Sequence, residues 1–142
     1  MNIAIVSGGF DPVHIGHVKL FQAAAEYGRV IVILNNDNWL TLKKGKTFMP
    51  QDERRYIIEE MRSVSEVIIT EHSENDEDRS VCRELKKIRE KYPEDDLFFI
   101  NGGDRKEGFV PEDSVCKDNN INLIYNAGGE KIQSSSWLTN NA

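Results

Sequence analysis

The sequence of 142 residues contains only two cysteines, which is too few for a framework of disulfide bonds. Cys82 and Cys116 also lack the close spacing of metal ligands, so we expect two reduced thiols in a cytoplasmic protein. No apolar run approaches the roughly 20 residues that a membrane-spanning helix needs, and we recognise no secretion signal. These absences exclude a disulfide-rich scaffold and predict a protein that has no membrane partner.

The sequence also contains fewer basic than acidic residues. Lysine and arginine together number 18, against 24 aspartates and glutamates, which gives a net charge of −6. Such an acidic chain argues against a nucleic acid partner, because nucleic acids are held largely by cationic contacts to their phosphates. A local basic pocket for a smaller anion is compatible with this balance. The length predicts one domain over residues 1–142, and we find no internal repeat or linker that would divide it.

Short apolar blocks alternate along the chain with helical patterns. The blocks are rich in β-branched residues, and several are apolar at consecutive positions, as in strands that are covered on both faces. They span residues 3–6, 30–34, 67–69, 97–100 and 121–125. Helical patterns occupy residues 15–27, a segment that begins at Pro50 or Gln51, the segment from Val81 to Tyr92, and a last turn at 134–139. This alternation predicts an α/β fold with a Rossmann-like, doubly wound parallel sheet of five strands.

Polar and glycine-rich residues follow four of the five apolar blocks. The segments are Ser7-Gly8-Gly9, Asn35-Asn36-Asp37, residues 101–105 and residues 126–129. In a doubly wound sheet, ligands bind beyond the carboxyl ends of the strands, where the strand order reverses. We therefore expect the functional site at this edge of the sheet.

The most informative stretch runs from Gly8 to His17 and reads Gly-Gly-Phe-Asp-Pro-Val-His-Ile-Gly-His. Its two glycines stand at a predicted strand-to-helix turn, where glycine lets the backbone come close to a ligand. The start of a helix attracts anions through its unpaired N–H groups. His14 and His17 share one face of the predicted helix and can reach the same phosphate. The stretch predicts a site for a nucleoside triphosphate. A zinc site is the alternative, although helical zinc histidines favour a spacing of four and need a third ligand.

The stretch Gly8–His17 resembles the signature of the HIGH-motif nucleotidylyltransferases, the cytidylyltransferase-like superfamily. The pattern of that superfamily, G-x-F-D-x-x-H-x-G-H, stands complete here. The resemblance implies an enzyme that transfers a nucleoside monophosphate from CTP or ATP to a phosphorylated polyol or sugar and releases pyrophosphate. It also implies Mg²⁺ as a cofactor, a homodimer, and catalytic roles for His14 and His17. It assigns nucleotide-binding roles to Gly8, Gly9, Phe10, Asp11 and Gly16.

A cluster of lysines follows the second predicted strand. Lys43, Lys44 and Lys46 surround Gly45, and a glycine among lysines indicates a mobile basic loop. Such lysines can fold over phosphates and neutralise a departing pyrophosphate. Relatives in the superfamily carry a lysine-bearing loop here, and we favour Lys44 and Lys46 as the catalytic pair. A loop that only faces solvent is the alternative.

Two further charged residues are candidates for substrate binding. Arg54 stands near the start of a predicted helix, where the superfamily places an arginine, and a guanidinium suits bidentate phosphate recognition. A purely structural ion pair is the alternative for this residue. Asp37, at the end of the second strand, is a candidate contact to the acceptor or the nucleotide.

Two motifs in the last third of the chain also resemble superfamily motifs. Gly103 and Asp104 match a glycine–aspartate motif after the fourth strand, where the alternative is a plain turn. Ser134, Ser135 and Ser136 match a terminal serine–threonine motif for phosphate binding, where the alternative is a helix cap. Both motifs are assigned to nucleotide binding.

The base and the acceptor stay open at this point. Length and layout favour the glycerol-3-phosphate cytidylyltransferase branch and CTP. The Gly-Gly-Asp sequence favours the heptose-phosphate adenylyltransferase branch and ATP, and Gly129 and Glu130 stand where the cytidylyltransferases carry an arginine and a threonine. A mononucleotide adenylyltransferase and a non-catalytic sensor of nucleotides are further alternatives.

Overall fold

The computed structural model describes residues 1–102, 111–125 and 127. Its centre is one sheet of five parallel strands in the order β3-β2-β1-β4-β5. The strands are β1 (Asn2–Gly8), β2 (Arg29–Leu34), β3 (Val64–Ile69), β4 (Asp96–Ile100) and β5 (Asn122–Ile124). The chain moves outward from β1 to β3 and then returns to the other side of β1. The predicted doubly wound α/β fold is therefore confirmed, and the order reverses between β1 and β4.

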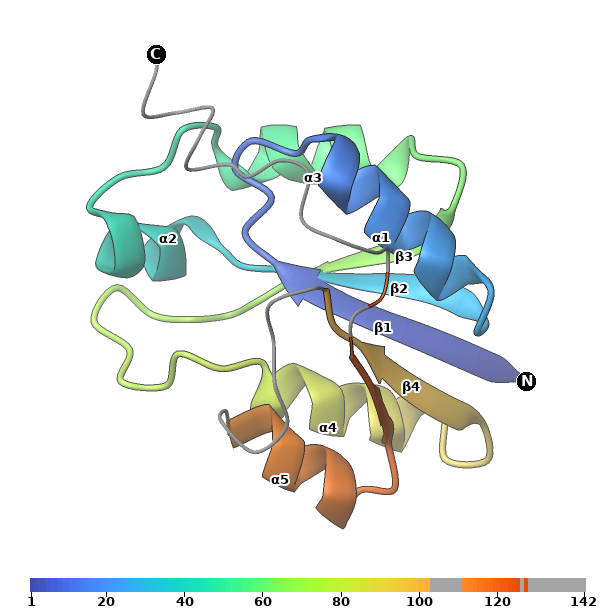
Figure 1. Ribbon diagram of the computed structural model, residues 1–142. Coiled ribbons are helices and arrows are strands. Elements are labelled where there is room, and N and C mark those ends of the chain that lie inside the picture. The colour runs from blue at the N-terminus through green and yellow to red at the C-terminus, as the bar shows by residue number, and fades with distance from the viewer. Residues whose placement is uncertain (103–110, 126, 128–142) are drawn as a thin grey trace.

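Helices cover both faces of the sheet (Figure 1). They are α1 (Ile15–Ala25), α2 (Asp37–Lys44), α3 (Gln51–Glu59), α4 (Cys82–Lys91) and α5 (Pro111–Asp118). Helices α1 and α3 lie on one face, and α4 and α5 lie on the other. Helix α2 lies beyond the carboxyl ends of β1 and β2, at the edge where the site is expected.

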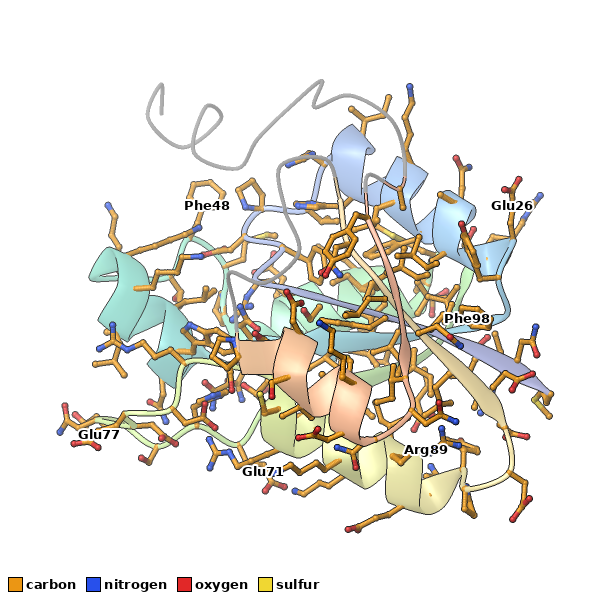
Figure 2. All side chains as sticks on the ribbon, turned by 60° about the horizontal axis from the view of Figure 1, so that its bottom comes forward. Glu26, Phe48, Glu71, Glu77, Arg89 and Phe98 are labelled. Carbon is orange, nitrogen blue, oxygen red and sulfur yellow. The ribbon has the colours of Figure 1, made fainter. Side chains whose placement is uncertain are left out.

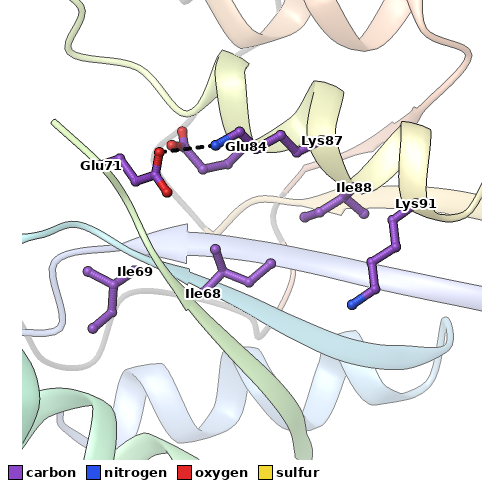
Figure 3. A pocket seen from close by; sticks show the side chains of 7 residues that line it. All are labelled: Ile68, Ile69, Glu71, Glu84, Lys87, Ile88 and Lys91. Atoms are coloured by element: carbon purple, nitrogen blue, oxygen red, sulfur yellow. Dashed lines mark hydrogen bonds and ion pairs between the residues drawn. The ribbon is translucent and has the colours of Figure 1, made fainter.

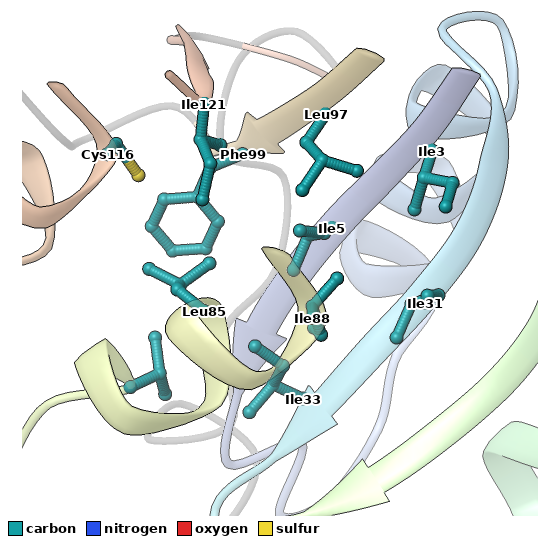
Figure 4. Close-up of a cluster of buried hydrophobic side chains, with 11 residues drawn as sticks. Ile3, Ile5, Ile31, Ile33, Leu85, Ile88, Leu97, Phe99, Cys116 and Ile121 are labelled. Carbon is teal, nitrogen blue, oxygen red and sulfur yellow. The ribbon is translucent and has the colours of Figure 1, made fainter. Parts of the chain in front are cut away.

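Consecutive residues of the central strands enter opposite cores. In β1, Ile3 and Ile5 pack toward α4 and α5, whereas Ala4 and Val6 pack toward α1 and α3. Figure 4 shows the first of these cores, in which Leu85 and Ile88 of α4 lie over the sheet. Because both faces are buried, the strands are apolar throughout instead of alternating, and this pattern makes them readable in the sequence.

Helix α2 differs from the sequence-based expectation. The Asn36 side chain accepts a hydrogen bond from the Trp39 N–H at its start, and Gly45 closes it with a φ of 85°. These are an ordinary N-cap and a left-handed C-cap. The prediction of a mobile basic loop is thus wrong for Lys43 and Lys44, which lie in the last turn of α2, whereas Lys46 lies in the connection that follows α2.

Among the described residues, no helix is long and apolar enough to cross a membrane. The surface carries exposed charged side chains, such as Glu26 and Glu77 in Figure 2.

Candidate active site

His14 and His17 stand at the start of α1 and cap it together. The Gly16 N–H donates to His14 Nδ1 at 3.1 Å, and the His14 N–H donates to His17 Nδ1 at 3.1 Å. The two rings are stacked, with centroids 3.8 Å apart and 25° between their planes. Each Nδ1 accepts a backbone N–H, so in each neutral ring the hydrogen is on Nε2. The pair therefore presents two Nε2–H donors from one helix turn.

The surroundings of His17 hold its imidazole neutral. Burial, the neighbouring His14 and the charge of Lys44 together lower the pKa of His17 from 6.5 to about 3. Phe10, itself buried with a φ of 49°, meets the His17 ring edge-on at a centroid distance of 4.8 Å. At neutral pH, His17 is thus a hydrogen-bond donor through Nε2 without carrying a charge.

Lys44 acts on His17 electrostatically, because its charge contributes to the lowered pKa of His17. Lys43, Lys44 and Lys46 all expose their side chains to solvent. Lys46 lies in the connection between α2 and α3, close in sequence to Phe48, which is 56% exposed (Figure 2). An imidazole pair beside a solvent-facing ammonium group suits a strongly anionic ligand.

The glycines of the turn leave room for neighbouring side chains, Gly9 for Leu40 of α2 and Gly8 for Phe10. A Cβ on Gly9 would lie 2.9 Å from Leu40 Cδ2, and one on Gly8 would lie 3.0 Å from the Phe10 ring. Gly16 contributes its backbone N–H to His14. The sequence predicted these positions as ligand contacts, and the geometry adds a packing reason for the first two.

Both carboxylate oxygens of Asp11 accept hydrogen bonds from the backbone that follows Lys46. The carboxyl group is 2% exposed, and it accepts from the Phe48 N–H through Oδ2 and from the Met49 N–H through Oδ1, each at 2.6 Å. This geometry favours a role in positioning the connection between α2 and α3 over the predicted contact to nucleotide.

Arg54 is likewise committed to the protein itself. Its side chain is fully buried and donates to the carbonyl oxygens of Met49 (2.9 Å), Gly9 (2.8 Å) and Asn35 (2.7 Å). A fourth bond, at 2.7 Å, joins it to the Asp37 carboxylate. The geometry favours the ion-pair alternative for Arg54 over phosphate recognition, and it makes Asp37 the partner of this arginine.

The sequence did not indicate which residues form hydrogen bonds with Asp11 and Arg54. The Met49 peptide accepts from Arg54 through its carbonyl and donates to Asp11 through its N–H. Any residue type can make hydrogen bonds through its backbone atoms, so the sequence around Met49 does not reveal these two bonds. Gly103, Asp104, Ser134, Ser135 and Ser136 lie outside the described residues.

The described residues do not supply a cage for a metal ion. Among them, no group of three or more histidine, cysteine, aspartate or glutamate side chains converges, and both oxygens of Asp11 are already bonded. Mg²⁺ normally keeps water and substrate phosphates as ligands beside one or two carboxylates.

A pocket of about 150 Å³ lies elsewhere, between β3 and α4 (Figure 3). Ile68, Ile69 and Ile88 form its apolar lining, and the ion pair of Glu71 with Lys87 lies at its edge. No predicted site residue lines it.

Comparison with known proteins identifies the family of this chain. The sequence pattern described as cytidylyltransferase-like matches residues 5–137. This chain belongs to the cytidylyltransferase-like family. It is 40% identical over 118 residues to the bifunctional protein HldE of Gluconobacter oxydans, which covers 81% of this chain and 22% of that protein. It is 35% identical over 69 residues to the glycerol-3-phosphate cytidylyltransferase of Bacillus subtilis, which covers 48% of this chain and 54% of that enzyme.

A solved structure shows the same fold. The lipopolysaccharide core biosynthesis protein from Thermoplasma volcanium superposes with a TM-score of 0.64 at 20% identity, covering 89% of this chain and 97% of the other. This chain of the cytidylyltransferase-like family spans about a fifth of the length of its HldE relatives. The predicted family and fold are confirmed.

Proposed function

We propose that this chain is a nucleotidylyltransferase that moves CMP or AMP from the triphosphate to a small phosphorylated acceptor. The observation that carries the proposal is the stacked pair of imidazoles at the start of α1, each of which accepts a backbone N–H at Nδ1. Two Nε2–H donors, three residues apart beside Lys44, suit the oxygens of a phosphate chain. The names of the relatives support the same reaction class for the family.

The chemistry asks little of the protein beyond positioning and charge stabilisation. An oxygen of the acceptor phosphate attacks the α-phosphorus, and the bond from that phosphorus to the bridging oxygen breaks as pyrophosphate leaves. The acceptor phosphate attacks as an anion, so no proton has to be removed from it. His14 and His17 donate to phosphate oxygens where negative charge increases, and Lys44 offsets the charge of the leaving pyrophosphate.

The neutral state of His17 fits this role. A histidine that donates through Nε2 and accepts through Nδ1 keeps its orientation, because its own helix start holds it. The resemblance to the superfamily further supports Mg²⁺ with the triphosphate and a homodimer, and we propose both.

The test is pyrophosphate release in the presence of Mg²⁺, with CTP, ATP, GTP and UTP against phosphorylated polyols, sugars and mononucleotides. His17→Asn places an oxygen where Nδ1 accepts from the His14 N–H, but it has no donor at the position of Nε2. We expect this variant to fold and to lose about 10²–10³-fold in kcat, as for the loss of one preorganised donor.

Lys19→Ala is the matched control, because Lys19 lies on the same helix with an exposed side chain, and we expect full activity. Release with one triphosphate settles the base. Binding of triphosphate without release for any pair would instead support the sensor alternative, and equal rates for His17→Asn and wild type would contradict the proposed role of the pair.

A further inference from the structure

The pocket between β3 and α4 has no part in the reaction proposed above. Strand β3 lies at one end of the strand order, so the pocket is away from the place where that order reverses, between β1 and β4. Ile68, Ile69 and Ile88 supply its apolar lining. Its volume of about 150 Å³ matches that of an apolar cavity known to hold one benzene molecule. The pocket is therefore large enough for a small apolar group.

One buried acidic side chain also lines this pocket. Glu84, in the first turn of α4, is 3% exposed, and its Oε1 has no hydrogen-bond partner among the described residues. Figure 3 shows Glu84 and Lys87 on the side of α4 that faces β3. The last bond of a glutamate side chain rotates easily, so a small turn of the carboxyl group can bring this oxygen to the pocket. Buried polar atoms in native proteins nearly always have a partner, so the unpaired oxygen indicates that a donor is missing.

The surrounding helix does not supply this donor. A glutamate at the third position of a helix commonly accepts the backbone N–H of the N-cap residue. The N-cap residue of α4 is Val81, and its N–H donates to Glu112 Oε2 at 3.2 Å. The bond that would satisfy Glu84 is thus made by another carboxylate. The adjacent Arg83 forms its ion pairs with two aspartates of the preceding loop.

The charges that line the pocket leave one carboxylate over. Lys87 pairs with Glu71 at 3.2 Å, and Lys91 pairs with Glu66 at 3.5 Å, so both lysines already have an acidic partner. Among the described residues, Glu84 takes part in neither pair. A buried carboxylate without a cation is a costly arrangement. The pocket therefore favours a ligand that carries a positive charge.

We propose that this pocket binds a small apolar amine, whose hydrocarbon part lies against the isoleucines and whose ammonium group donates to Glu84. An ammonium group supplies both the missing hydrogen bond and the missing charge, whereas a hydroxyl group supplies the bond alone. A ligand with a carboxylate or phosphate in the same place would set a like charge beside Glu84. The proposal does not rest on the proposed function, because none of the groups assigned to the reaction lines the pocket.

The test is a titration of the protein with three probes of similar shape, benzylamine, benzyl alcohol and benzoate, at neutral pH. NMR shifts of the Ile68, Ile69 and Ile88 methyl groups report both the affinity and the place of binding. We expect benzylamine to bind with a Kd of about 1 mM or below, and benzyl alcohol and benzoate to bind at least about tenfold more weakly. Equal affinities for benzylamine and benzyl alcohol, or no shift of these methyl groups with benzylamine, would overturn the inference.

Glu84→Gln separates the charge from the shape of the pocket, because it keeps the size of the side chain. We expect the affinity for benzylamine to fall about tenfold, while that for benzyl alcohol stays within about twofold. Glu90→Gln makes the same change at an exposed position of α4 and is the matched control, with unchanged affinities.

Ile68→Phe adds volume to the lining and should weaken the binding of both probes. Urea unfolding of each variant checks that it is folded. An undiminished affinity for benzylamine in a folded Glu84→Gln variant would overturn the role of Glu84, and undiminished affinities in a folded Ile68→Phe variant would overturn the placement in this pocket.

Discussion

The histidine pair and the Asp11–Arg54 pair belong to the same edge of the sheet, yet they use their polar atoms in opposite ways. His14 and His17 each accept a backbone N–H of their own helix start at Nδ1, so the hydrogen of each neutral ring is on Nε2. The Asp11 carboxylate accepts hydrogen bonds from backbone N–H groups, and the Arg54 guanidinium donates to backbone carbonyls and to Asp37. The difference teaches that charged residues at this edge can hold the backbone of the site in place, whereas the histidines keep a donor for other groups.

The largest effect should follow from removing the buried guanidinium. Arg54→Leu leaves the carbonyls of Gly9, Asn35 and Met49 without their donor. We expect a loss of about 3–5 kcal/mol in the free energy of unfolding, measured with urea. Arg55→Leu is the neighbouring control, with a half-exposed side chain and surface ion pairs, and should change stability by about 0.5 kcal/mol or less.

An Arg54→Leu variant of normal stability with a raised KM for triphosphate would reverse the comparison. Such a result would indicate that Arg54 binds the ligand, as proposed for the two histidines.

A smaller effect should follow from Asp11→Asn. The amide keeps one acceptor oxygen and replaces the other by an NH₂ group, so the Phe48 or the Met49 N–H loses its partner. We expect a loss of about 1–3 kcal/mol in unfolding free energy and a raised KM for triphosphate, because the segment after Lys46 is no longer held. Asp52→Asn, at an 80% exposed side chain, is the control. Unchanged stability together with a fall in kcat would assign Asp11 to the reacting groups instead.

The smallest effect should appear as a pH dependence of stability. The pKa of His17 is lowered from 6.5 to about 3 by burial, His14 and Lys44. Between pH 6.5 and pH 3, His17 is therefore protonated in the unfolded chain but not in the folded chain. The free energy of unfolding decreases as the pH falls through this range. Between pH 6 and pH 5, we expect wild type to lose about 1 kcal/mol more than His17→Asn, since a full proton per pH unit is worth about 1.4 kcal/mol and partial exposure reduces it. Urea titrations at both pH values measure this, and parallel losses in the two proteins would contradict the lowered pKa.

The sequence allowed the sheet and the histidine pair to be predicted for the same reason. Strands buried on both faces, such as Ile3–Val6, are apolar at every position, and the spacing of His14 and His17 follows directly from helix geometry. Helix α2 was missed, because its caps were read as loop residues around the lysines. The burial of Arg54 was also not predictable, because arginine is rarely fully buried and its partners here are mostly carbonyl oxygens. The tautomers of the two histidines depend on backbone N–H groups, which residue types do not reveal.

The Met49 peptide, held by Asp11 on one side and Arg54 on the other, also determines where this chain tolerates a change in length. The N–H groups of residues 48 and 49 both donate to the carboxylate of Asp11. An extra residue inserted between them would move these two donors apart, so that they could no longer bond to one carboxylate. The stretch from Gly45 to Thr47 has no such double anchor, and a Cβ on Gly45 meets no atom within 4 Å. An inserted peptide tag or a natural insertion is therefore best accommodated before Phe48, and the anchored part of the connection should keep a constant length in any redesign.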